Sequence, residues 1–126
     1  MDEIQINGVS VPVDFMDVDF IDAYEKETRS LEAELKKEKA KKYSSLADQL
    51  RAQCVLVEKY LDTLLGEGTS EKIFKGKNNF KEHLMAIMEL ADGFKASQQE
   101  LNNITNKYTQ RVHLNGNQMA VMRNAR

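Results

Sequence analysis

Residues 46–65 form the most apolar run of helical length in the chain, and this run limits the possible folds more than any other segment. Its apolar side chains recur every three or four residues, the spacing that places them on one face of an α-helix. They are Leu46, Leu50, Cys54, Val57, Leu61 and Leu64. Leu56 and Tyr60 widen this face, and Val55 lies on the far side. A helix that is apolar on more than one side needs several neighbours, so we expect the central helix of a small bundle.

Flanking residues mark where this helix and its neighbours begin and end. Ser44 or Ser45 can cap the start of the central helix, and Gly66 is expected to end it. A second helix is predicted over residues 18–42, capped by Asp17 or Asp19.

A third long helix is predicted over residues 79–109, where apolar side chains follow a seven-residue rhythm. They are Phe80, Leu84, Ile87, Ala91, Phe94, Leu101 and Tyr108. Gly93 lies inside this run and favours either a kink or a close helix approach. Between the central and third helices, Thr69 or Ser70 is expected to cap one short turn.

The first fifteen residues have the pattern of a β-hairpin. Ile4 and Ile6 alternate with polar residues, and the pair Asn7-Gly8 tolerates the positive φ angles that a tight hairpin turn requires. Pro12 has no N–H, so the returning strand is an edge or ends early. A lone hairpin is marginally stable in water, so it must pack on the helices or extend the sheet of a neighbouring subunit.

The sequence therefore predicts a mainly α (α+β) fold in a single domain over residues 1–126, a small bundle of three main helices with an N-terminal β-hairpin. We expect the hairpin in residues 1–16, the helical bundle in 17–110, and a C-terminal arm or small second hairpin in 111–126. The presence of one Pro and six Gly in 126 residues agrees with long helices.

The residue types that carry enzyme chemistry are few and show no motif. No zinc-binding pattern joins His83 and His113, and the single thiol, Cys54, lies in the apolar face of the central helix. An acidic cluster lacks the Gly and terminal Glu of a calcium loop, so we interpret it as a helix cap. Its members are Asp14, Asp17, Asp19 and Asp22. We therefore expect a protein that is not an enzyme and that has no catalytic residue, no cofactor and no metal site.

Charge is distributed unevenly along the chain. Residues 1–34 hold ten acids against Lys26 and Arg29, whereas the only charged residues after Glu100 are basic. The two ends either neutralise each other within one chain or meet head to tail between subunits. A lysine cluster in residues 36–42 is interleaved with glutamates, so we interpret it as a solvated helix end, with nucleic-acid binding as the less favoured alternative. No run approaches transmembrane length and no signal peptide is present, so we expect an intracellular protein without membrane contact.

The stretch IQINGVSVPVDFMDVDFIDAYEKE resembles the openings of small proteins encoded in the tail-gene region of siphoviruses and prophages of Gram-positive bacteria. In those proteins a strand, an Asn-Gly turn and a second strand precede an acidic and aromatic entry to the helices. The residues that carry the resemblance are Ile4, Ile6, Asn7, Gly8, Val11, Pro12, Asp14, Phe15, Asp17, Asp19, Phe20 and Tyr24.

Several of those proteins are treated as tail assembly chaperones, which organise the tape-measure protein while tail-tube subunits assemble around it. The resemblance implies a non-enzymatic protein of the host cell cytoplasm that contacts the tape-measure protein and forms a homo-oligomer. Two alternatives remain open, a structural virion or connector component and a small nucleic-acid-binding regulator. We expect interface residues where apolar side chains occur in segments that a small bundle would not wholly bury. They are Ile4, Ile6, Val9, Val11, Val112, Leu114, Met119 and Met122.

Overall fold

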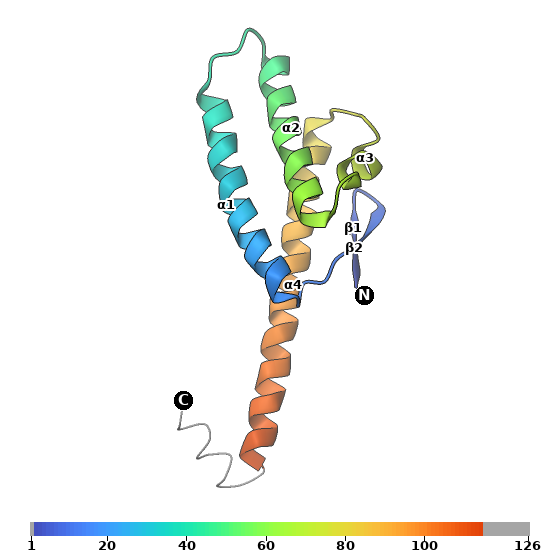
Figure 1. Cartoon of the computed structure of the whole chain (residues 1–126), viewed down its shortest axis with the longest axis vertical. Helices are drawn as coiled ribbons and strands as arrows, with labels where there is room; N and C mark the ends of the chain where they lie inside the picture. Colours follow the sequence, from blue (N-terminus) through green and yellow to red (C-terminus); the bar gives the residue numbers. More distant parts are fainter. Residues whose placement is uncertain (1, 115–126) are drawn as a thin grey trace. The chain divides into compact units, whose positions relative to one another are not determined.

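The computed structural model describes residues 2–114, with side chains described for residues 2–112. The elements are β1 (Glu3–Ile6), β2 (Val9–Pro12), α1 (Val18–Ala40), α2 (Leu46–Leu65), α3 (Thr69–Phe74) and α4 (Phe80–Leu114) (Figure 1). The predicted fold class, mainly α with an N-terminal hairpin, is confirmed. Contacts divide the chain into two compact units, Met1–Phe94 and Lys95–Arg126. The single domain expected from the sequence stays a prediction.

The N-terminal hairpin forms at the predicted turn and lies on the helices of the first unit. Strands β1 and β2 pair antiparallel, with Ile4 opposite Val11. Asn7 and Gly8 have φ angles of 51° and 77°, as a tight primed turn requires. The Asn7 Nδ2 atom donates to the carbonyl oxygen of Ile73 at 3.2 Å, which ties the turn to α3. Packing on the helices was one of the two expected ways to stabilise this hairpin.

Helix α1 begins at the cap that the sequence offered and ends two residues earlier than predicted. The Asp17 carboxylate accepts a hydrogen bond from the backbone N–H of Asp19 at 2.9 Å. The helix ends at Ala40, inside the charged stretch, where the backbone N–H of Lys41 donates to the carbonyl oxygen of Lys37 and the chain then becomes extended. Its first half packs through aromatic rings, and Tyr24 stacks on Phe94 with ring centroids 4.2 Å apart.

Helix α2 has the predicted bounds and contributes most to the core. The Ser45 hydroxyl caps its start by accepting from the N–H of Asp48, and Gly66 ends it with a φ angle of 111°. Figure 1 shows α2 antiparallel to α1 and beside it. Four apolar residues of α2 are buried, namely Cys54, Val57, Tyr60 and Leu61. The predicted central helix is therefore confirmed.

The short helix α3 is present, but its predicted capping residues are wrong. The N-cap is Gly68, which makes no side-chain hydrogen bond, and Thr69 and Ser70 lie inside the helix. Asp62 of α2 supplies the capping interaction instead. Its carboxylate accepts from the Ser70 backbone N–H at 2.8 Å and from the Ser70 hydroxyl at 3.1 Å.

Helix α4 is continuous and longer than predicted. It runs to Leu114, so residues 111–114 belong to the helix and not to the expected arm, and the rest of that arm lies outside the described residues. The helix is unbroken at Gly93. A Cβ atom at Gly93 would lie 3.0 Å from the Phe15 ring and 3.2 Å from Ile4, so the close approach is made by the hairpin segment and not by another helix.

Candidate protein-binding surfaces

A buried polar cluster joins α2 to α4 and is the most chemically elaborate arrangement in the described residues. The His83 ring is fully buried and stacks on Phe74 with ring centroids 3.7 Å apart. Its Nδ1 atom lies 2.7 Å from the Asn79 carbonyl oxygen, which can only accept, so Nδ1 carries a proton. Its Nε2 atom shares a hydrogen bond of 2.8 Å with the Glu58 carboxyl group. Because the ring has no exposed surface, we assign this cluster to holding the two helices together.

The single thiol is buried as expected. Cys54 is 1% exposed, and burial, followed by the nearby Glu58 charge, raises the pKa of its thiol above the ordinary value. A thiol that is hidden and protonated is a weak nucleophile.

Acidic side chains near the start of α1 accept hydrogen bonds from backbone N–H groups. The carboxylates of Asp14 and Asp17 accept from the backbone N–H groups of Met16 and Asp19. Among the described residues, no group of three or more His, Cys, Asp or Glu side chains could hold a metal ion.

The front half of α4 exposes a patch of long apolar side chains, which we call the Met patch. It consists of Leu84, Met85 and Met88, which are 38%, 46% and 62% exposed. Residues separated by three and four positions are neighbours on a helix surface, so the three side chains lie together. Flexible, polarisable Met side chains adapt to partners of different shape. This patch can therefore cover an apolar surface on another protein.

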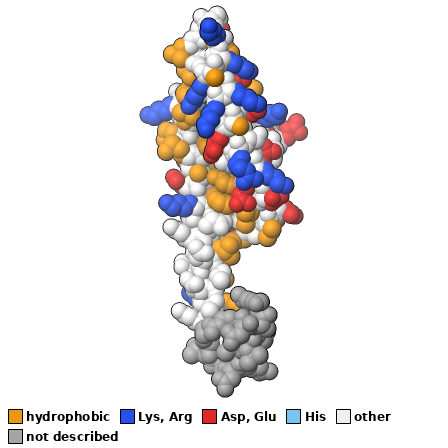
Figure 2. Space-filling model, turned by 90° about the vertical axis from the view of Figure 1, so that its left-hand side faces the viewer, with side chains coloured by type: hydrophobic (Ala, Val, Ile, Leu, Met, Phe, Trp, Pro, Cys, Tyr) orange, Lys and Arg blue, Asp and Glu red, His pale blue; other side chains and the backbone are white. Residues whose placement is uncertain are grey.

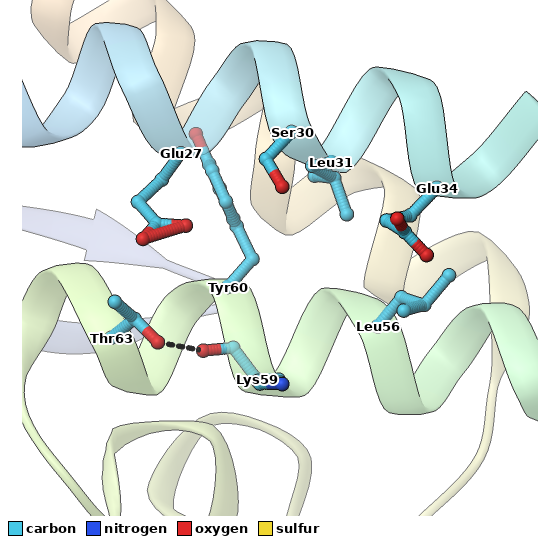
Figure 3. A pocket seen from close by; sticks show the side chains of 8 residues that line it. All are labelled: Glu27, Ser30, Leu31, Glu34, Leu56, Lys59, Tyr60 and Thr63. Atoms are coloured by element: carbon cyan, nitrogen blue, oxygen red, sulfur yellow. Dashed lines mark hydrogen bonds between the residues drawn. The ribbon is translucent and has the colours of Figure 1, made fainter.

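A groove of about 410 Å³ lies between α1 and α2 (Figure 3). Leu31 and Leu56 form its apolar part, Glu27 and Glu34 add negative charge on the α1 side, and Lys59 adds one positive charge on the α2 side. The Tyr60 side chain extends from α2 toward α1, and its hydroxyl is 2.7 Å from that of Thr28. Burial raises the pKa of Tyr60 to about 12. Two carboxylates against one ammonium group leave the lining net negative, so the groove suits a long aliphatic side chain that ends in a positive charge.

The second unit carries an apolar stripe, which we call the 101–108 stripe. It consists of Leu101, Ile104 and Tyr108, which are 37%, 52% and 61% exposed. The three residues are separated by three and four positions, so they share one side of α4. No residue from 99 to 111 is buried.

The structure places the predicted interface residues in three different situations. Ile6 and Val11 are 0% and 4% exposed within the chain's own core, so the premise that their side chains are exposed is wrong. The hairpin packs its inner face on the helices because this packing removes the apolar surface of those side chains from water. Ile4 and Val9 are partly buried against the same core.

The remaining predicted interface residues lie near or beyond the end of α4. Val112 is half-buried, and Leu114 is the last residue of the helix. Met119 and Met122 lie outside the described residues, so their role stays a prediction. None of the eight predicted residues lies in the Met patch or in the 101–108 stripe.

Figure 2 shows basic side chains spread over much of one face of the molecule, with acidic side chains among them. The predicted lysine cluster is exposed, but two of its members pair with acids of the same helix. Lys37 lies 3.5 Å from Glu34 and Lys41 lies 3.1 Å from Glu38. These pairs reduce the positive potential that a phosphate backbone would meet.

Comparison with protein families places the chain in one family. A family model described as "Family of unknown function (DUF6673)" matches residues 7–124. The chain belongs to this family. The search of the curated proteins found no match, and neither did the search of the solved structures. The DUF6673 match begins at the Asn-Gly turn and includes the Met patch, the α1–α2 groove and the 101–108 stripe.

None of the described helices of this DUF6673 member combines the length and the apolar character of a membrane-crossing segment.

Proposed function

We propose that the chain is a non-enzymatic assembly protein of the phage or prophage tail region, acting in the host cell cytoplasm as a tail assembly chaperone. In this role it binds the tape-measure protein through helix-to-helix contacts and associates with further copies of itself. The resemblance of residues 4–24 to openings of such proteins supports this proposal, and so does the mainly helical fold.

The observation that carries the proposal is the Met patch. Its most exposed member, Met88, is 62% exposed although it lies within the front half of a continuous helix. A tape-measure protein is a long helical chain that aggregates when its apolar faces are uncovered. A chaperone for such a chain needs an apolar surface that tolerates variation in the bound sequence, and Met side chains provide that tolerance.

The α1–α2 groove provides a second binding surface, which receives basic side chains of the same partner. Leu31 and Leu56 contact the aliphatic stem of a Lys or Arg side chain, while Glu27 and Glu34 lie near its charged end. A helical partner that alternates apolar and basic residues matches both surfaces. The pairing gives modest affinity at each contact, which suits a chaperone that must later release its client.

The proposal is tested by co-expressing the chain with the tape-measure protein of the same phage and measuring how much tape-measure protein stays soluble. The variant Met85→Lys/Met88→Lys adds two charges to the patch, and the matched control Ala33→Lys/Ala47→Lys adds two charges at exposed positions of α1 and α2. We expect the patch variant to lose most of the soluble tape-measure protein and the control to keep it. Equal solubility with both variants would contradict the proposal.

Mass spectrometry of purified particles separates the chaperone from a structural virion or connector component. A chaperone leaves the particle after assembly, so its peptides should be absent, whereas a structural component remains in a fixed ratio to other tail proteins. A fixed ratio would replace the chaperone proposal with the structural one.

A further inference from the structure

The 101–108 stripe has the spacing of a buried helix face. Leu101, Ile104 and Tyr108 each follow a buried residue of α4 by eighteen positions, which is about five helical turns. Those buried residues are His83, Ala86 and Leu90. The stripe thus repeats the periodicity of a core-forming segment, while its own side chains remain 37% to 61% exposed. Such a face requires another apolar face to cover it.

Two exposed charges of opposite sign bracket residues 101–106, which contain the first two residues of the stripe. Glu100 precedes Leu101 directly, and Lys107 precedes Tyr108 directly, so the two charges are seven residues apart along the same helix. The segment between them, residues 101–106, contains no charged residue. An acid at one end and a base at the other make this segment self-complementary when it meets a second copy running in the opposite direction.

We propose that two copies of the chain pair antiparallel through this segment. Leu101 of each copy packs on Ile104 of the other, and Glu100 of each copy forms an ion pair with Lys107 of the other. The contact is isologous, because one two-fold axis generates both apolar layers and both ion pairs. It deepens the self-association part of the proposed function, and it uses residues separate from the Met patch.

The charges select this arrangement over its competitors. In a parallel pair, each residue would lie level with its own counterpart on the other copy. Glu100 would then lie near Glu100, Lys107 near Lys107, and Arg111 near Arg111. An antiparallel pair shifted by seven residues would place Lys107 against Lys107. Of these three arrangements, only the proposed register brings both Glu100 carboxylates to Lys107 ammonium groups, and like charges at close range oppose the others.

The paired segment spans only a few turns, so the contact is smaller than a standard stable interface. We therefore expect a reversible dimer whose population depends on concentration. Added salt weakens it, because its ion pairs are exposed to solvent.

The test is analytical ultracentrifugation of the full chain over a wide concentration range at low salt. Glu100→Lys replaces both ion pairs by repulsions and should weaken dimerisation about ten-fold or more. Lys107→Glu should do the same. The double variant Glu100→Lys/Lys107→Glu reverses both charges and should restore the wild-type dissociation constant. Asp92→Lys, an equal charge change at an exposed position of α4 in the first unit, is the matched control and should have little effect.

Rescue by the double variant would support the antiparallel pair, because a general charge effect would not cancel in this way. A monomer at every concentration, or charge-reversed single variants that dimerise like the wild type, would overturn the inference. So would higher multimers that grow without a limit, since an isologous contact closes at two copies. These outcomes are independent of tape-measure binding, which the Met85→Lys/Met88→Lys variant reports.

Discussion

Replacing Gly93 by alanine tests whether the hairpin segment packs on α4 as closely as the structure shows. In an ordinary exposed helix position, this substitution stabilises the protein by about 1 kcal/mol, because alanine loses less conformational entropy than glycine. At position 93 the new Cβ atom would lie 3.0 and 3.2 Å from two carbons of the Phe15 ring. It would also lie 3.2 Å from a methyl carbon of Ile4.

These distances are shorter than the roughly 3.5–4.0 Å at which carbon atoms attract one another. The Phe15 ring is 5% exposed and packs edge-on against Phe20 and Phe94, so it has little room to move away. Overpacking of this kind costs about 1–3 kcal/mol. After the gain in helix propensity is subtracted, we expect a net loss of about 1 kcal/mol in the free energy of unfolding.

Urea unfolding followed by far-ultraviolet circular dichroism measures this loss. The control is Ala96→Gly, which changes the same pair of residues at an exposed position three residues further along α4 and should cost about 1 kcal/mol through helix propensity alone. If Gly93→Ala instead raised the stability by the amount that Ala96→Gly lowers it, no close contact would exist at position 93. The packing of the hairpin segment described above would then be refuted.

Three further substitutions or titrations test other parts of the fold. Asn7→Ala should cost about 1–2 kcal/mol in urea unfolding, because it removes hydrogen bonds to Ile73 and Glu82 and disfavours the positive φ angle; Asn7→Gly, which keeps the angle, should cost less. Burial raises the pKa of Tyr60 from 10.0 to about 12, so its neutral phenol contributes stability that is full below pH 10.0 and is lost as the pH rises through about 12. Ultraviolet absorbance should show a phenol that ionises at about pH 12, and its absence in Tyr60→Phe would assign it to Tyr60, whereas a titration unchanged by that substitution would contradict the burial. Because Cys54 is buried and its thiol pKa is raised, a thiol reagent should react slowly with the folded chain and rapidly in urea, and equal rates would contradict the placement of Cys54.

Local patterns were sufficient to predict most of the secondary structure. The spacing of apolar residues in 46–65 gave α2 with its observed bounds, and Asn7-Gly8 gave the hairpin turn. Both signals arise from residues close together in the sequence, where helix periodicity and turn conformation act directly. The N-terminal caps of α1 and α2 were predictable for the same reason, since a capping side chain bonds to a backbone group within three residues.

Long-range contacts could not be read from such patterns. Asp62 replaces Thr69 and Ser70 as the group that caps α3, because α2 brings its carboxylate beside a segment eight residues away. Gly93 had the signature of a helix defect, but the contact that it permits comes from Phe15, far away in the sequence.

The candidate surfaces show the same limitation. Apolar character alone marked Ile6 and Val11 as interface residues, although both are buried, and it could not distinguish them from the exposed Met85 and Met88. Which side of an apolar helix is covered depends on the packing of its neighbours.

The most direct test of the central claim is photo-crosslinking from the Met patch during tail assembly. A photoreactive amino acid is placed at position 88 in one variant and at position 33, an exposed position of α1, in the control. We expect a crosslink from position 88 to the tape-measure protein and none from position 33. Efficient assembly with no crosslink from position 88 to the tape-measure protein would contradict the claim that this surface binds it.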